Sequence, residues 1–333
     1  MRSPSESAFA PKADPTRYVA SPLHDAARDW PQTNCYVDLW IEATHARGLS
    51  PEAMLGFTAT LDFEGDQFTF FKPPLNDLET LYGFCVRELS IYDDLAGHLV
   101  DQCAQGRLIL VEMDAFHLPD TRGVSYGLES SKTTIGVNRI DPAARRIDYF
   151  HNDGYFRADG ADYDGLMAFG AESGRLKLPP YAEILKADFA PLDAPAARDC
   201  ARSLLARHLA RKPARNPISA FGARLPDLID RVAAHEPEFF HKFAFNSLRQ
   251  LGANFELMAS GLAWIGEPGE FAGEIEACRA LSGSAKAFQF LLARAIVRRK
   301  AVGLDGSLAT MTEAYERLFD GLARRDRALR LAS

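Results

Sequence analysis

The spacing of apolar residues changes character near Pro195. Before this point, short apolar runs alternate with polar residues and are separated by turn residues, a pattern typical of strands. After it, apolar residues recur every three or four positions in Arg-, Ala- and Leu-rich segments, which indicates helices. The sequence therefore predicts an α+β domain followed by an all-helical domain.

The α+β domain is expected to begin with helices and a hairpin. Apolar spacing predicts a helix over residues 34–47. Residues 55–63 and 67–71 flank an acidic turn that contains Gly65, and they predict a β-hairpin. Over residues 76–105 the apolar positions follow helical spacing, so this stretch is expected to form two helices.

Four later segments predict strands, and they set the expected domain limits. These segments are residues 107–116, 132–140, 146–151 and 182–186. The second and third are joined by a short turn that contains proline, so they predict another hairpin. Three regions follow from the whole pattern, namely an extended, surface-draped lead-in over 1–30, an α+β domain over 31–194 and a helical domain over 195–333.

Charge is distributed unevenly between the two halves of the chain. The net charge of the whole chain is −7, but residues 195–333 carry 21 Lys and Arg against 15 Asp and Glu, a net charge of +6. The first 194 residues carry 17 against 30, a net charge of −13. Such an asymmetry favours either a docking surface for an acidic partner or attraction between the two halves.

Composition disfavours several classes of function. No segment approaches the roughly 20 apolar residues of a membrane span, and the N-terminus lacks the apolar core of a secretory signal. The five cysteines are dispersed and contain no Cys-x-x-Cys pair, so neither a disulfide framework nor a zinc site is expected, and a reducing cytoplasm is the expected location. Glycine-rich phosphate loops and metal-binding motifs are absent, so we expect no metal or cofactor bound by the chain, and no nucleic-acid partner.

Cys35 is the strongest candidate for a nucleophile. Thr33 and Asn34 are good helix N-caps, so Cys35 falls in the first turn of the predicted helix. The helix dipole and the unpaired backbone N–H groups there favour a thiolate. Those N–H groups, together with the side chain of either Gln32 or Asn34, would be placed to hold an oxyanion. The alternative is a structural cysteine, which is the more common role.

A helix-borne cysteine followed by an antiparallel sheet is the order found in papain-like enzymes, which also need a histidine base and an orienting partner. His151 is the first candidate base, with Asp148 and Asn152 nearby, although strand alternation places Asp148 on the opposite face from His151. His117 is the second candidate. A strand-end histidine that merely caps a loop is an equally good interpretation of His151.

Three motifs resemble the bacterial family known as domain of unknown function 1839 (DUF1839). They are the run from Leu110 to Thr121 (LVEMDAFHLPDT), the segment Lys132-Thr133-Thr134-Ile135 and the run from Tyr149 to Tyr155 (YFHNDGY). The resemblance covers most of the chain. The chain is also similar, more distantly, to the papain-like acyltransferase of butirosin biosynthesis. Asn34-Cys35 of this chain matches the position of that enzyme's nucleophile.

The resemblance implies a function and partners. Members of the family are often encoded beside amino acid:carrier protein ligases and small carrier proteins. An acyl- or aminoacyltransferase is therefore implied, in which Cys35 takes the group from the thioester on a carrier's phosphopantetheine arm and passes it to an amine. If water replaced the amine, the enzyme would be an amidase or thioesterase. A homodimer would be compatible with this expectation.

One departure from the family pattern bears on catalysis. The resemblance implies a histidine just before Lys132, but this chain has Glu129-Ser130-Ser131 there. Serine cannot accept a thiol proton near neutral pH. Three alternatives follow: the base comes from elsewhere in the chain, the protein is impaired, or the substitution was selected for a different function. The competing prediction is a non-catalytic protein that binds a carrier. Arg294, Arg298, Arg299 and Lys300 form a basic cluster that suits an acidic carrier.

Overall fold

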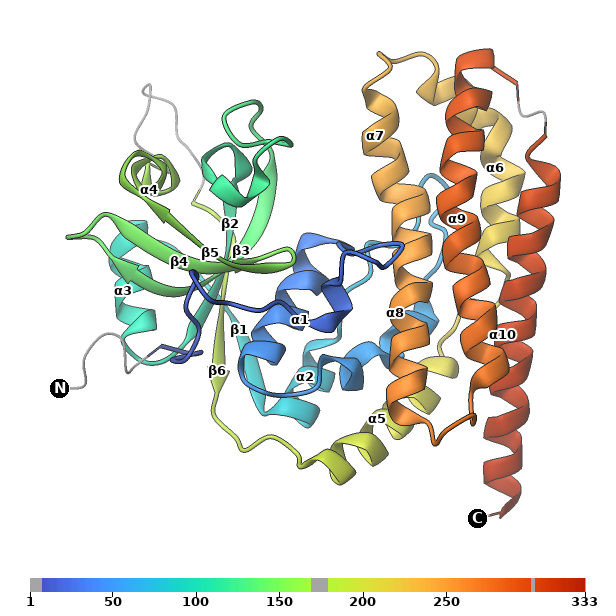
Figure 1. Cartoon of the computed structure of the whole chain (residues 1–333), viewed down its shortest axis with the longest axis horizontal. Helices are drawn as coiled ribbons and strands as arrows, with labels where there is room; N and C mark the ends of the chain where they lie inside the picture. Colours follow the sequence, from blue (N-terminus) through green and yellow to red (C-terminus); the bar gives the residue numbers. More distant parts are fainter. Residues whose placement is uncertain (1–7, 169–178, 301–302, 333) are drawn as a thin grey trace. The chain divides into compact units, whose positions relative to one another are not determined.

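The computed structural model describes residues 8–168, 179–300 and 303–332 (Figure 1). They divide into two compact units, each made of segments that are not contiguous in sequence. Unit 1 contains the described residues of 1–25, 34–51 and 75–192, and unit 2 contains those of 26–33, 52–74 and 193–333. Residues 26–33 and 52–74, which the sequence analysis placed ahead of the helical domain, thus pack with the helices.

Unit 1 is built on a six-stranded antiparallel sheet in the order β1-β6-β2-β3-β4-β5. The strands are β1 Phe84–Leu89, β2 Leu108–Asp114, β3 Lys132–Asp141, β4 Arg146–His151, β5 Gly154–Asp159 and β6 Ala182–Ala187. The helices of this unit are α1 Cys35–Ala46, α2 Leu75–Tyr82, α3 Leu95–Cys103 and α4 Gly160–Met167. The predicted strands over 107–116, 132–140, 146–151 and 182–186 are confirmed, as is the helix that carries Cys35.

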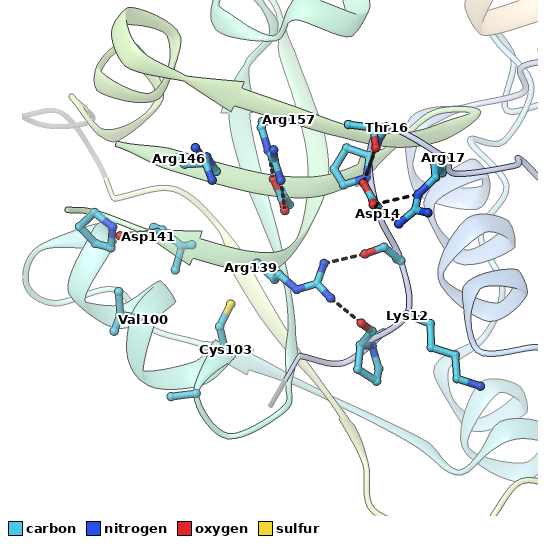
Figure 2. Close-up of a pocket in the computed structure, with 17 residues that line it drawn as sticks. Lys12, Asp14, Thr16, Arg17, Val100, Cys103, Arg139, Asp141, Arg146 and Arg157 are labelled. Atoms are coloured by element: carbon cyan, nitrogen blue, oxygen red, sulfur yellow. Dashed lines mark hydrogen bonds and ion pairs between the residues drawn. The ribbon is translucent and has the colours of Figure 1, made fainter. Parts of the chain in front are cut away.

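One face of the sheet is covered by α1. Leu110, Gly136 and Phe150 lie in register on three neighbouring strands of this face. Gly136 allows the close approach, because a Cβ built there would lie 3.3 Å from Leu39 of α1. The N-terminal segment also packs on this face. Arg139 ties it down by donating hydrogen bonds to the carbonyl oxygens of Pro11 and Ala13, both at 2.6 Å (Figure 2).

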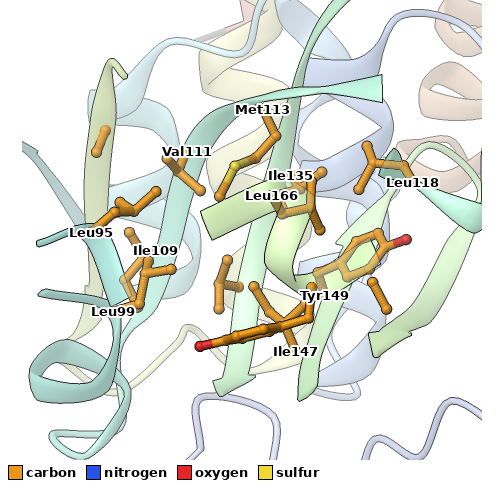
Figure 3. Close-up of a cluster of buried hydrophobic side chains, with 14 of the residues drawn as sticks. Leu95, Leu99, Ile109, Val111, Met113, Leu118, Ile135, Ile147, Tyr149 and Leu166 are labelled. Carbon is orange, nitrogen blue, oxygen red and sulfur yellow. The ribbon is translucent and has the colours of Figure 1, made fainter. Parts of the chain in front are cut away.

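The opposite face of the sheet is covered by α3 and α4 (Figure 1). Its core consists mainly of apolar side chains from the strands and both helices, and it includes Tyr149 and Tyr163 (Figure 3). Ile109, Val137 and Tyr149 are in register across β2, β3 and β4. Because side chains alternate along a strand, His151 lies on the same face as Tyr149, whereas Asp148 lies on the α1 face.

Two predictions for unit 1 and its neighbouring segments are wrong in detail, and two elements of unit 1 were not predicted. Residues 76–105 form α2, β1 and α3 rather than two helices, because Gly83 ends α2 with a φ of 68° and the chain turns into a strand. Of the lead-in, the structure describes residues 8–30, and these do not simply drape over the surface, since Phe9 and Leu23 are buried. Both β5 and α4 were missed.

Unit 2 is helical, as predicted. Its helices are α5 Ala194–Leu209, α6 Pro217–Val232, α7 Phe239–Ala244, α8 Gln250–Ile265, α9 Ala272–Arg298 and α10 Asp305–Ala332, with a π-helical turn at Phe245–Arg249. The predicted hairpin over 55–71 is confirmed only around its turn, where Phe63 and Phe68 form an antiparallel β-bridge and the Thr69 N–H donates to the carbonyl oxygen of Asp62. Its first strand is wrong, because Pro51–Thr60 forms a 3-10 helix. Asn254 of α8 donates to the carbonyl oxygen of Thr58 and holds this segment against the helices.

Candidate functional site

Cys35 occupies the first position of α1, as the sequence predicts. The Asn34 side chain caps the helix by accepting a hydrogen bond from the Val37 backbone N–H at 3.0 Å. Cys35 is half-buried, and no hydrogen bond joins its thiol to any residue that the structure describes. The thiol is therefore free of structural bonds, at a helix start where unpaired N–H groups favour a bound anion.

The segment that leads into α1 is fixed from within unit 2. Arg249, in the π-helical turn, donates to the backbone carbonyl oxygens of Gln32 at 2.9 Å and of Thr33 at 3.0 Å. π-Helical turns are common near functional sites because they displace a side chain from regular helical spacing. Sequence reasoning did not find Arg249, since nothing local marks its role.

The structure does not bring His151 to Cys35. Cys35 belongs to α1 on one face of the sheet, whereas His151 is buried on the other face. His151 Nδ1 lies 2.6 Å from Asp120 Oδ2, and its Nε2 lies 2.7 Å from Thr133 Oγ1. Since a carboxylate only accepts, Nδ1 carries the proton that it donates to Asp120. Both ring nitrogens are thus already engaged.

Asp120 links this histidine to the core. It also accepts a hydrogen bond from the Tyr149 hydroxyl at 2.6 Å. Burial and the neighbouring Asp120 carboxylate raise the pKa of Tyr149, so the hydroxyl stays a donor. The order carboxylate, imidazole, hydroxyl resembles a hydrolase triad, but His151 is only 1% exposed. The cluster of Asp120, Thr133, Tyr149 and His151 is therefore a buried structural network, and it agrees with a structural role for His151.

The two expected partners of His151 behave differently. Asp148 accepts two hydrogen bonds from Arg157, at 2.7 and 3.0 Å, on the α1 face. Its separation from His151 confirms the strand-alternation argument. Asn152 forms the β4–β5 turn with a φ of 45°, and its amide nitrogen lies 3.4 Å from His151 Nδ1. Because Nδ1 already donates to Asp120, Asn152 does not orient the ring.

The position where the resemblance implies a base holds Ser130, which is exposed and lies two residues before β3. Strand alternation extended back from Lys132 places Ser130 toward the α1 face and Ser131 toward the opposite one. The Ser131 hydroxyl lies 3.2 Å from that of Ser125. On the strands that the structure describes, His151 is the one histidine, so no described strand presents a histidine toward α1.

A second buried cluster lies along α1 itself. The His24 ring lies 2.5 Å from Glu42 and 3.3 Å from Asp38, while the Tyr18 hydroxyl donates to Glu42 at 2.6 Å. Burial lowers the pKa of His24, but hydrogen bonds and charge from Asp38 and Glu42 outweigh it and raise the pKa to about 9. His24 is therefore a protonated clamp on α1. The sequence feature that could have revealed this clamp is the pair Asp38 and Glu42, which lie one turn apart on a mostly apolar helix.

The second candidate base, His117, is a packing residue. It lies in a short 3-10 helix, and a Cβ built at Gly165 of α4 would fall 2.2 Å from its Nδ1. The absence of a side chain at Gly165 thus leaves room for the ring. No group of three or more metal-ligating side chains is found in the described part of the chain, and the five cysteines are free.

In unit 2, the C-terminal half of α9 presents an exposed stripe, here named the α9 stripe. It consists of Phe290, Arg294, Val297 and Arg298, which are spaced to share one helix face. Phe290 is 66% exposed and Val297 is 86% exposed. Within the residues described, the side chains of Arg294 and Arg298 form no ion pair or hydrogen bond. Arg299, in contrast, donates to the carbonyl oxygen of Ala233.

Comparison with known proteins places this α+β and helical pair of units in a family. The DUF1839 N-terminal domain matches residues 19–187, and the DUF1839 C-terminal domain matches residues 195–324. The chain belongs to the DUF1839 family. No curated protein matches it. Among the helices described, none is long and apolar enough to cross a membrane.

Proposed function

We propose that this chain binds a small acidic carrier protein through the α9 stripe and performs no cysteine–histidine chemistry of its own. The α9 stripe carries this proposal. Large apolar side chains exposed beside unpaired cations suit a partner with an acidic rim around an apolar patch. The excess of basic residues in 195–333 would steer such a partner toward this unit.

A binding role is supported by the described strands, none of which presents a histidine toward α1. A papain-like mechanism needs an imidazole that can take the thiol proton and return it to the leaving group. His151 is on the other face with both nitrogens engaged, and the position before Lys132 holds serine. Unit 1 would then be a papain-like scaffold that has lost its base.

A carrier-binding measurement tests the proposal. The ligand is a small acidic carrier protein in its phosphopantetheinylated form, loaded by an amino acid:carrier protein ligase, and isothermal titration calorimetry gives the affinity. Arg294→Glu/Arg298→Glu is expected to weaken binding at least tenfold, because both cations become like charges toward the carrier. Arg215→Glu, at another exposed cation of unit 2, is the control and should bind as the wild type does. Equal affinity for all three proteins would refute the proposal.

The second candidate is the Cys35-dependent acyl- or aminoacyltransferase, or its hydrolytic counterpart. It is favoured by one observation, namely that Cys35 is half-buried with no hydrogen bond to a described residue, at a helix start that would hold an oxyanion. In this candidate, the carrier thioester carbon is attacked by the Cys35 sulfur, the phosphopantetheine thiol leaves with a proton, and an amine or water then takes the acyl group. The likeness to the butirosin acyltransferase belongs to this candidate.

The rate at which a loaded carrier loses its aminoacyl group separates the two candidates. A transferase would accelerate this loss when an amine is added, and Cys35→Ala would abolish the acceleration. Under the binding proposal, the wild type and Cys35→Ala leave the carrier's load equally intact.

A further inference from the structure

Unit 1 contains a cavity of about 1420 Å³ that neither candidate function uses (Figure 2). Its walls are the N-terminal segment 11–17, the ends of β3, β4 and β5, and α3. Drug-sized ligands usually occupy about 300–1,000 Å³, so this space suits a whole small molecule. Cys35 is not among the residues that line it.

The cavity is basic, although it lies in the acidic half of the chain. Five cations line it against three carboxylates. Two of the carboxylates are neutralised by lining arginines, Asp148 by Arg157 at 2.7 Å and Asp14 by Arg17 at 3.2 Å. The remaining cations are Lys12, Arg139 and Arg146, and only Asp141 stands against them.

These three cations are available for a ligand in different ways. Arg139 binds the backbone carbonyl oxygens of Pro11 and Ala13, so no carboxylate offsets its charge, and its Nε is buried without an acceptor. Lys12 and Arg146 are exposed, and neither side chain has a hydrogen bond or ion pair to a residue the structure describes.

We infer that this cavity binds a phosphorylated small molecule. Guanidinium groups match phosphate oxygens in shape and charge, and a lysine adds a mobile point charge. The apolar lining from α3 and from the prolines would cover the organic part of the ligand. This site is independent of Cys35 and of the α9 stripe, so it stands whether or not carrier binding is upheld.

Calorimetry at constant ionic strength tests this inference with three probes, which are inorganic pyrophosphate, AMP and adenosine. Pyrophosphate and AMP are expected to bind, whereas adenosine, which lacks phosphate, should bind at least tenfold more weakly than AMP. Lys12→Gln/Arg146→Gln is expected to weaken pyrophosphate binding at least tenfold. Since both residues are exposed, the variant should keep the wild-type circular dichroism spectrum.

Arg87→Gln provides the matched control. Arg87 is an exposed arginine of unit 1 on β1, at the opposite edge of the sheet from β5. The Arg87→Gln variant should bind pyrophosphate as the wild type does. The inference is overturned if neither pyrophosphate nor AMP binds, if AMP and adenosine bind equally, or if the double variant and Arg87→Gln lose affinity to the same extent.

Discussion

At the scale of single residues, the positions of the histidines determine whether the Cys35 thiol has a base to accept its proton. Sequence reasoning placed Cys35 correctly at the start of α1, because N-capping is local chemistry. It could not place Asp120, which reaches His151 from a short 3-10 helix 31 residues away. Thr133 was within reach of sequence reasoning, since the predicted hairpin already puts β3 beside β4.

Restoring a base should restore thiol reactivity if unit 1 is a papain-like scaffold. Ser130→His introduces an imidazole on the α1 face, and we expect alkylation of Cys35 by iodoacetamide to become at least tenfold faster at pH 7. Ser131→His, which adds the same ring toward the opposite face, is the control and should leave the rate unchanged. Peptide mass spectrometry follows Cys35, with Cys85 and Cys103 as internal references. Equal rates in both variants would argue against the papain-like organisation.

The Asp120 network should matter for stability rather than for the thiol. Asp120→Asn removes the charge that holds Tyr149 and His151, so the free energy of unfolding of unit 1 should fall by about 2 kcal/mol. Asp153→Asn, in the adjoining β4–β5 turn, should have little effect. The stability of both variants is measured by urea titration, with the unfolding of unit 1 followed by hydrogen–deuterium exchange of β3 and β4. A slower alkylation of Cys35 in Asp120→Asn would contradict a purely structural role.

The His24 clamp predicts a pH dependence of stability. The pKa of His24 is about 9 in the folded state, above its ordinary value of 6.5, so protonation stabilises the fold. The contribution, about 3 kcal/mol, is complete below pH 6.5 and is lost as the pH rises through 9. His24→Gln should be less stable at pH 6 and show a flatter profile. His45→Gln, near the end of α1, is the control. In urea titrations from pH 6 to 10, its free energy of unfolding should depend on pH as that of the wild type does.

At the scale of elements, the sequence predicted the helices and strands whose apolar residues recur at a clear period. The central strands β2, β3, β4 and β6 and the helical half follow from alternation and from helical spacing. The strand β1 was missed, because its apolar residues Phe84, Cys85 and Val86 continue the apolar spacing of α2 and only Gly83 separates the two. The 3-10 segment Pro51–Thr60 depends on contacts with α8 that no local pattern reveals.

The packing of α8 against the entering segment depends on one glycine. A Cβ built at Gly252 would lie 2.4 Å from the Trp30 ring, which is buried in unit 2. Gly252→Ala should therefore reduce the free energy of unfolding of unit 2 by about 1–3 kcal/mol. Gly273→Ala in α9 meets nothing within 4 Å, and it should instead be neutral or stabilise by up to about 1 kcal/mol. Thermal unfolding compares the two, and a destabilised Gly273→Ala would undermine this explanation.

At the scale of the whole molecule, the chain separates its possible roles between two units. Unit 1 carries the free thiol and the basic cavity, and unit 2 carries the α9 stripe. The α+β and helical halves could be predicted from the sequence, because the hydrophobic period changes near Pro195. The assignment of 26–33 and 52–74 to the helical unit could not, because it depends on tertiary contacts between segments far apart in the chain.

Native mass spectrometry of the chain mixed with an aminoacyl-loaded carrier protein tests the central claim most directly, followed by denaturation of the same sample. The account predicts a non-covalent complex in the native spectrum, and a denatured chain whose mass is unchanged. A denatured chain heavier by the aminoacyl group, with the addition mapped to Cys35, would contradict it and establish the transferase instead.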